Sequence, residues 1–203
     1  MKTLIRHSRV IDPASQFDQI TDIGIQDGKI AFIGPAPSEF IPEEIIEADG
    51  LVACPGLIDT SARLREPGSE CRASMITELH AAVAGGITRL AVPPDTDPPL
   101  DEPGLVRMLK HGAAQLNHAH VYPVGALTVK LKGELITEMG ELAEAGCIAF
   151  SQADESLINT IVLLRSMQYA STFGFPVWLR PEDPFLGHSG LVHDGEFSTL
   201  RGL

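Results

Sequence analysis

The stretch "ITRLAVPPDTDPPLDEPGLVRMLKHGAAQLNHAHVYPVGAL", residues 87–127, decides the fold class of this 203-residue chain. Its apolar run at 87–94 predicts a strand, and a second apolar run at 120–127 predicts another. Between them, residues 101–117 have helical periodicity, with Pro103 in the first turn where a helix tolerates it. A strand, a helix and a second strand in this order are typical of a parallel βαβ unit.

The same alternation continues on both sides of this unit. Further strands are predicted at 51–59, 147–151 and 175–181, and further helices at 70–86, 133–146, 155–174 and from 195 onward. Five strands that alternate with helices predict an α/β fold with a parallel sheet, either doubly wound or part of a (β/α)₈ barrel. A complete barrel needs roughly 200 residues or more, so we expect an incomplete barrel of five βα units at 55–203.

Residues 1–54 have a different rhythm, with short β-branched runs separated by turns. "QDGK" at 26–29 predicts a tight hairpin through Asp27-Gly28. We therefore expect a small N-terminal β-sandwich subdomain ahead of the barrel.

The amino-acid composition indicates which kinds of binding partner can be excluded. The chain has 15 basic and 27 acidic side chains and a net charge of -12, which argues against nucleic-acid and anionic-membrane partners. The first residues lack the apolar core of a signal peptide. Three widely spaced cysteines without a C-x-x-C motif fit reduced thiols, so a cytoplasmic location is expected.

Several motifs carry a resemblance that covers nearly the whole chain. "PGLIDTSARLREPG" at 55–68, "AGGITRLAVPPDTDPPLDEP" at 84–103, "VYPVGALTVKLKGE" at 121–134 and "EMGELAEAGCIAFS" at 138–151 resemble dihydroorotases of the amidohydrolase superfamily. That family interconverts carbamoyl-aspartate and dihydroorotate in pyrimidine biosynthesis. The resemblance implies a TIM barrel of the metal-dependent hydrolase type, with zinc as the cofactor of the family.

The first barrel strand departs from the family pattern H-x-H-x-R, in which two histidines bind metal and the arginine grips a substrate carboxylate. Here the histidine positions hold Ser61 and Arg63, while the arginine is kept as Arg65. Serine is a poor neutral ligand for zinc, and a permanently charged guanidinium group cannot coordinate a cation.

Later positions depart in the same direction. Asp95 stands where the family has a substrate-contacting asparagine, and Gln152 or Ala153 stands where a metal-bridging carboxylate or modified lysine is expected. Arg180 occupies the histidine position at the end of the fifth strand. This combination resembles the inactive dihydroorotase-like subunits that assemble with the catalytic chain of aspartate carbamoyltransferase, so the leading hypothesis is a non-catalytic homologue without a metal cofactor.

Other interpretations remain open at the level of sequence. An active cyclic-amide hydrolase would need a different metal site, for which His188, His193 and Asp183 are the best candidates. A truncated product without function is a second alternative, and a homo-oligomer is a further possible state. Arg65, with Asp95 facing it, has two interpretations: residual anion binding, or an ion pair with a loop carboxylate.

Overall fold

The computed structural model describes residues 1–183, 185 and 192–202. The chain forms two compact units, Met1–Gly56 and Leu57–Leu203. The sequence placed this boundary after residue 54, which is two positions earlier.

The first unit is a five-stranded sheet in which β1 lies at the centre. Its order is β3-β2-β1-β4, and β5 also pairs with β1. The strands are β1 (Lys2–Asp12), β2 (Phe17–Gln26), β3 (Lys29–Ile33), β4 (Glu44–Glu47) and β5 (Val52–Ala53). Asp27 and Gly28 both have positive φ, 52° and 74°, as a two-residue turn between antiparallel strands requires, so the predicted hairpin is confirmed.

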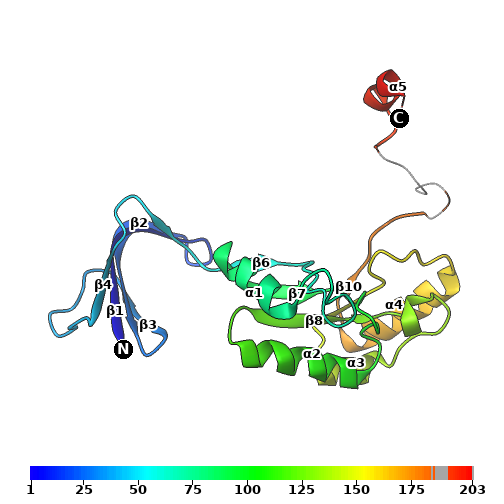
Figure 1. Ribbon diagram of the computed structural model, residues 1–203, viewed down its shortest axis with the longest axis horizontal. Coiled ribbons are helices and arrows are strands. Elements are labelled where there is room, and N and C mark those ends of the chain that lie inside the picture. The colour runs from blue at the N-terminus through cyan, green and yellow to red at the C-terminus, as the bar shows by residue number, and fades with distance from the viewer. Residues whose placement is uncertain (184, 186–191, 203) are drawn as a thin grey trace. The chain divides into compact units, whose positions relative to one another are not determined.

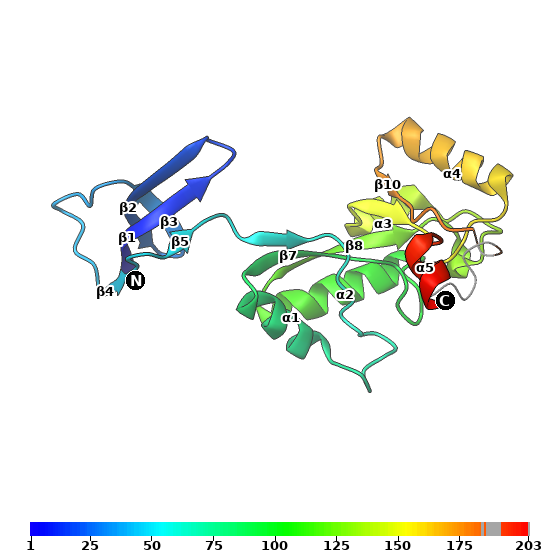
Figure 2. The same cartoon turned by 90° about the horizontal axis from the view of Figure 1, so that it is seen from above.

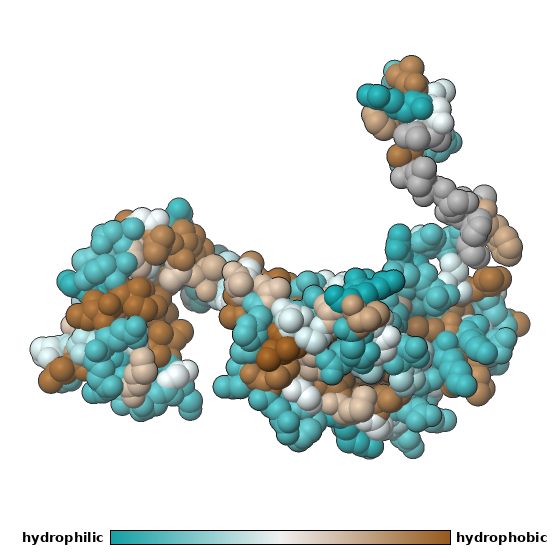
Figure 3. Space-filling model, in the orientation of Figure 1, coloured by the Kyte–Doolittle hydropathy of each residue, from teal (hydrophilic) through white to brown (hydrophobic). Residues whose placement is uncertain are grey.

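The predicted N-terminal β subdomain is present as a single sheet, so residues 1–56 supply one layer, and the second layer of the expected sandwich stays a prediction. One consequence is apolar surface, visible as brown areas on this unit in Figure 3. The large apolar side chains exposed on its sheet strands are Ile20, Ile30, Ile33, Ile45, Ile46 and Val52.

The second unit contains the predicted parallel sheet, which curls as half of a barrel (Figures 1 and 2). Its order is β10-β9-β8-β7-β6, so β6 and β10 are the edges. The strands are β6 (Leu57–Asp59), β7 (Ile87–Val92), β8 (His120–Ala126), β9 (Ala149–Ser151) and β10 (Val177–Trp178). The α/β class with a parallel sheet is confirmed.

The strand predicted at 51–59 is divided between the two sheets. Its first part is β5, which pairs with β1, and its last part is β6, which pairs with β7. Pro55 lies between them and has no N–H group to donate to a strand ladder, which explains the break.

Five α-helices and one short 3₁₀ turn complete the described part of the chain. They are α1 (Met75–Ala84), α2 (Pro103–Leu116), the turn η1 (Val129–Leu131), α3 (Met139–Ala145), α4 (Thr160–Phe173) and α5 (Glu196–Arg201). The helix predicted at 133–146 is too long, because Thr137 is tied to the end of β8: its hydroxyl donates to the Ala126 carbonyl at 2.6 Å. None of the described helices combines the length and hydrophobicity that crossing a membrane requires.

The main core lies between the sheet and the helices α1, α2 and α3. Leu79 of α1, Leu109 of α2 and Leu142 of α3 pack with Leu90 of β7 and Phe150 of β9, and each is at most 2% exposed. This packing fixes the strands, and therefore fixes where the loops after their carboxyl ends meet.

Candidate functional site

The loops that follow the strands surround a cavity of about 590 Å³ at the carboxyl edge of the sheet. In parallel barrels this edge carries the active site. Three of the four positions at which the resemblance implies lost metal ligands line it, namely Ser61, Arg63 and Arg180. Asp154 lines it as well.

Arg63 lies at the centre of this edge and binds two carboxylates. Its Nε donates to Asp95 Oδ2 at 2.6 Å, and its Nη2 donates to Asp154 Oδ2 at 2.7 Å. The side chain is 30% exposed. The hydrogen bond to Asp95 and the negative charges of both carboxylates raise the pKa of Arg63 above its already high ordinary value, so this group is a permanent cation.

Arg180 also binds Asp154 and links it to a further carboxylate. Its Nη1 donates to Asp154 Oδ1 at 3.2 Å, and its Nε lies 3.1 Å from Glu182 Oε2. The charges therefore alternate from Asp95 through Arg63, Asp154 and Arg180 to Glu182. We call these five residues the ion-pair network. It joins the loops that follow β6, β7, β9 and β10.

The fourth implied ligand position falls on Gln152 or Ala153. Ala153 lines the cavity and has no ligand atom in its side chain, whereas Gln152 is not among the lining residues. It is 1% exposed, and both ends of its amide are hydrogen bonded. Its Oε1 accepts from Thr128 Oγ1 at 2.9 Å, and its Nε2 donates to the Leu131 carbonyl at 2.7 Å. Lys130 and Leu131 have φ of 54° and 57°, a conformation that side-chain-bearing residues rarely adopt. Gln152 therefore holds a strained turn instead of serving as a ligand.

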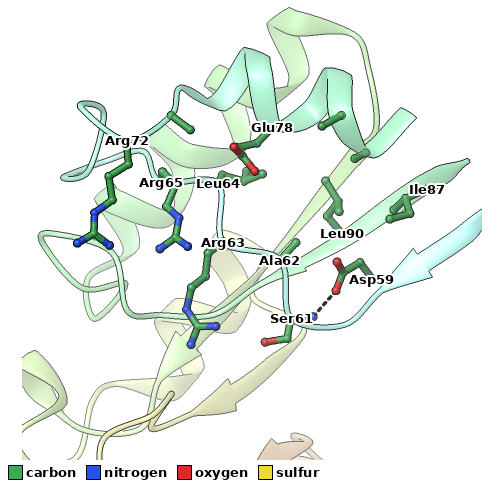
Figure 4. Close-up of a pocket in the computed structure, with 13 residues that line it drawn as sticks. Asp59, Ser61, Ala62, Arg63, Leu64, Arg65, Arg72, Glu78, Ile87 and Leu90 are labelled. Carbon is green, nitrogen blue, oxygen red and sulfur yellow. Dashed lines mark hydrogen bonds between the residues drawn. The ribbon is translucent and has the colours of Figure 1, made fainter. Parts of the chain in front are cut away.

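The residues at the four implied ligand positions do not form a binding site for a zinc ion. Two guanidinium groups stand where the family pattern has histidines, and a divalent cation beside them would be repelled. Ser61 is exposed, and its backbone N–H donates to Asp59 Oδ1 at 2.8 Å (Figure 4). Asp154, which follows the expected bridging position by one or two residues in the sequence, forms ion pairs with both arginines.

Arg65 does not form the ion pair that one interpretation of the sequence gave it: within the described residues it has no carboxylate partner. The loop is held differently, because Glu66 accepts a hydrogen bond from the Met75 backbone N–H at 2.9 Å, at the start of α1. Asp95, which the sequence set opposite Arg65, pairs with Arg63.

The alternative metal site is only partly within the described residues, because His188 lies outside them. Asp183 Oδ1 accepts from the Phe185 N–H at 2.8 Å, and His193 Nδ1 lies 2.6 Å from the carbonyl oxygen of Asp194. In the described part of the chain, neither residue belongs to a group of three side chains spaced for an ion.

One such group does occur there, in the N-terminal sheet, and sequence analysis missed it. His7, Glu47 and Asp49 place their ligand atoms within 4.8 Å of one another, because β4 runs parallel to β1. All three are exposed, and Arg6 already pairs with Glu47 at 3.0 Å.

Comparison with known proteins identifies the family. A dihydroorotase-like family model matches residues 50–203. The chain belongs to the dihydroorotase-like family. Over all 203 residues it is 40% identical to a dihydroorotase-like protein of Pseudomonas putida and 41% identical to one of Pseudomonas aeruginosa. It is 38% identical to a dihydroorotase of Syntrophotalea carbinolica. It covers 48% of each, so it spans about half the length of these relatives.

Solved structures show the same fold for this dihydroorotase-like chain. An L-hydantoinase from Arthrobacter aurescens matches with a TM-score of 0.75 at 20% identity, over 89% of this chain and 41% of that one. A dihydroorotase matches with a TM-score of 0.63 at 13% identity, over 90% of this chain and 52% of that one. At such identities the likeness concerns fold alone: this chain has the fold of about half of each of those longer chains.

Proposed function

We propose that this dihydroorotase-like chain is non-catalytic and acts in pyrimidine biosynthesis as a structural or regulatory partner of the aspartate carbamoyltransferase catalytic chain in the cytoplasm. The observation that carries the proposal is the ion-pair network, which occupies the place where the family pattern expects metal ligands. Two Pseudomonas relatives bear the name dihydroorotase-like protein, and others bear the name dihydroorotase, so names alone do not decide between the roles.

The chemical argument concerns what a metal supplies to a hydrolase of this kind. A bound zinc ion generates hydroxide near neutral pH and polarises the amide carbonyl. Arg63 and Arg180 cannot hold such an ion, and neither can lower the pKa of a bound water as an open metal coordination site does. The proposed role therefore includes no metal cofactor and no catalytic residue in the described half-barrel.

The structural argument concerns what the network does instead. A metal pair in a barrel mouth ties together ligands from several strands. Here Arg63 joins the loops after β7 and β9, and Arg180 joins the loop after β9 to its own. Two fixed cations bridged by the Asp154 carboxylate thus hold the same edge of the sheet without requiring metal. An ordered but unreactive edge suits a scaffold.

The proposal is tested by co-expression of the full-length protein with the aspartate carbamoyltransferase catalytic chain of the same organism. Co-purification at a fixed ratio, with no hydrolysis of dihydroorotate by the dihydroorotase-like component, is the expected result. Hydrolysis that a chelator abolishes would contradict it and favour a metal site built from other residues. Insolubility that the partner does not relieve would favour a product without function.

A further inference from the structure

One imidazole and two carboxylates meet on the exposed surface of the N-terminal sheet. His7 Nδ1 lies 3.6 Å from Glu47 Oε2 and 3.5 Å from Asp49 Oδ2, and all three residues are exposed. His7 belongs to β1, Glu47 ends β4, and Asp49 follows in the next turn. Because β4 pairs with β1 in parallel, the two strands lie side by side and bring one nitrogen and two oxygens to the same place (Figure 1).

An irregularity in β1 sets the position of His7. The register of β1 against β2 shifts between Ile5 and Ser8, and His7 has a φ of 57°. Such an irregularity re-aims a side chain relative to its neighbours in the strand. The backbone N–H of His7 donates to Asp22 Oδ1 on β2 at 3.0 Å, so a side chain of the neighbouring strand holds this conformation.

The two carboxylates are carried by backbone that is tied to β1. Glu47 is in register with Arg6, and Arg6 Nη1 donates to Glu47 Oε1 at 3.0 Å, which leaves Oε2 as the oxygen near His7. The N–H of the buried Ala48 donates to the Arg6 carbonyl at 2.9 Å, just before Asp49. Arg6 therefore orients Glu47 as hydrogen-bonding partners orient the ligands of metal sites.

The distances fit ligands around an ion better than direct hydrogen bonds. An N–H···O bond spans about 2.7–3.2 Å, and both distances from His7 are longer. Ligands at about 2.0–2.2 Å from a tetrahedral zinc ion lie roughly 3.3–3.6 Å from one another, which includes both distances. The oxygens of Glu47 and Asp49 lie within 4.8 Å of each other, and these exposed side chains have room to adjust.

We propose that His7, Glu47 and Asp49 bind a divalent transition-metal ion, represented by zinc, with water completing its coordination. An imidazole with carboxylates suits such an ion, whereas magnesium prefers oxygen ligands alone. Three exposed ligands and the nearby cation of Arg6 allow the ion to exchange with solvent, so the site is loaded by added metal and loses it on dialysis. The site lies in the N-terminal sheet and does not depend on the proposed function.

The test is calorimetric titration of the full-length protein, after dialysis against metal-free buffer, with zinc chloride and separately with magnesium chloride. A pH of about 7.5 is suitable, because metal binding requires a neutral imidazole. The variants are His7→Asn, Glu47→Gln and Asp49→Asn. Asparagine tolerates positive φ, so His7→Asn preserves the backbone of β1.

Glu44→Gln is the matched control. Glu44 is an exposed carboxylate on the same strand, and at three positions before Glu47 its side chain leaves the opposite face of the strand. Circular dichroism of each variant checks that the fold is retained.

Saturable binding of zinc, tighter than that of magnesium, is expected in the wild type and in Glu44→Gln. Loss of a ligand should weaken zinc binding at least about tenfold in each of the other three variants, since even the outer partners of metal ligands contribute that much. Four results would overturn the site: no saturable binding of zinc, equal affinity for magnesium, zinc binding that any of the three variants leaves unchanged, or equal weakening in Glu44→Gln.

Discussion

Replacing Gln152 with glutamate restores a carboxylate at the position where the resemblance implies a metal-bridging ligand, and its cost can be worked out from the structure. The amide Nε2 donates to the Leu131 carbonyl at 2.7 Å, and the side chain is 1% exposed. An ionised carboxylate at this position would place one of its oxygens against the Leu131 carbonyl oxygen, so two buried hydrogen-bond acceptors would face each other without a donor. A protonated carboxyl would keep the donor, so the least costly solution is to hold the introduced carboxyl group neutral.

The free-energy cost of keeping the introduced carboxyl group protonated depends on the pH. A glutamate has an ordinary pKa of about 4.3, so keeping it protonated at pH 7 costs about 3.7 kcal/mol, at about 1.4 kcal/mol per pH unit. In the unfolded chain the group is ionised above about pH 4.3, so the unfolded state binds fewer protons and stability falls as pH rises. We expect Gln152→Glu to lose about 3–4 kcal/mol at pH 7 and only about 1 kcal/mol at pH 5.

Urea unfolding followed by circular dichroism at both pH values measures this difference. Gln168→Glu is the matched control, because Gln168 is exposed on α4 and accepts from Arg165, so a carboxylate there costs little. A loss below about 1 kcal/mol at pH 7, or a loss equal at both pH values, would refute the buried hydrogen-bonding role of Gln152.

Three further outcomes follow from named contacts. Asp154→Asn should reduce the free energy of unfolding by about 1 kcal/mol in low salt, because two partly exposed ion pairs weaken. The loss of stability should become smaller in roughly 1 M NaCl, which screens exposed charges. A loss of the same size at both salt concentrations would indicate that Asp154 contributes through packing. In the native protein Ellman's reagent should titrate Cys54 and Cys71 but not Cys147, because burial raises the pKa of the Cys147 thiol to about 12; three reactive thiols would contradict this. Because an unfolded thiol ionises near pH 9, stability should fall by about 1.4 kcal/mol per pH unit between pH 9 and 12, and Cys147→Ala should remove that part of the fall.

The alternation of apolar runs with helical segments was enough to predict the parallel sheet, because strands buried on both faces are apolar throughout and helices carry one apolar face. Element ends were predicted less well. The helix expected at 133–146 begins only at Met139, since Thr137 bonds to the end of β8 through a contact that no local pattern announces.

The candidate site was also predicted only in part. The resemblance identified Ser61, Arg63, Gln152 and Arg180 as positions where ligands are missing, but not what replaces them. Asp154 is 91 residues from Arg63, and only the packing of the barrel strands brings the two together. Alternating charges at successive strand ends were a usable signal for this network, since the carboxyl ends of parallel strands meet at one edge.

The most direct test of the central claim is the zinc content and dihydroorotase activity of the full-length protein, purified from cells grown with added zinc. An active dihydroorotase treated in the same way provides the positive control. With Arg63 and Arg180 bound to Asp154 at the metal positions, we predict no stoichiometric zinc and no turnover of dihydroorotate. Stoichiometric zinc with turnover that a chelator abolishes and zinc restores would show that the protein is an active enzyme.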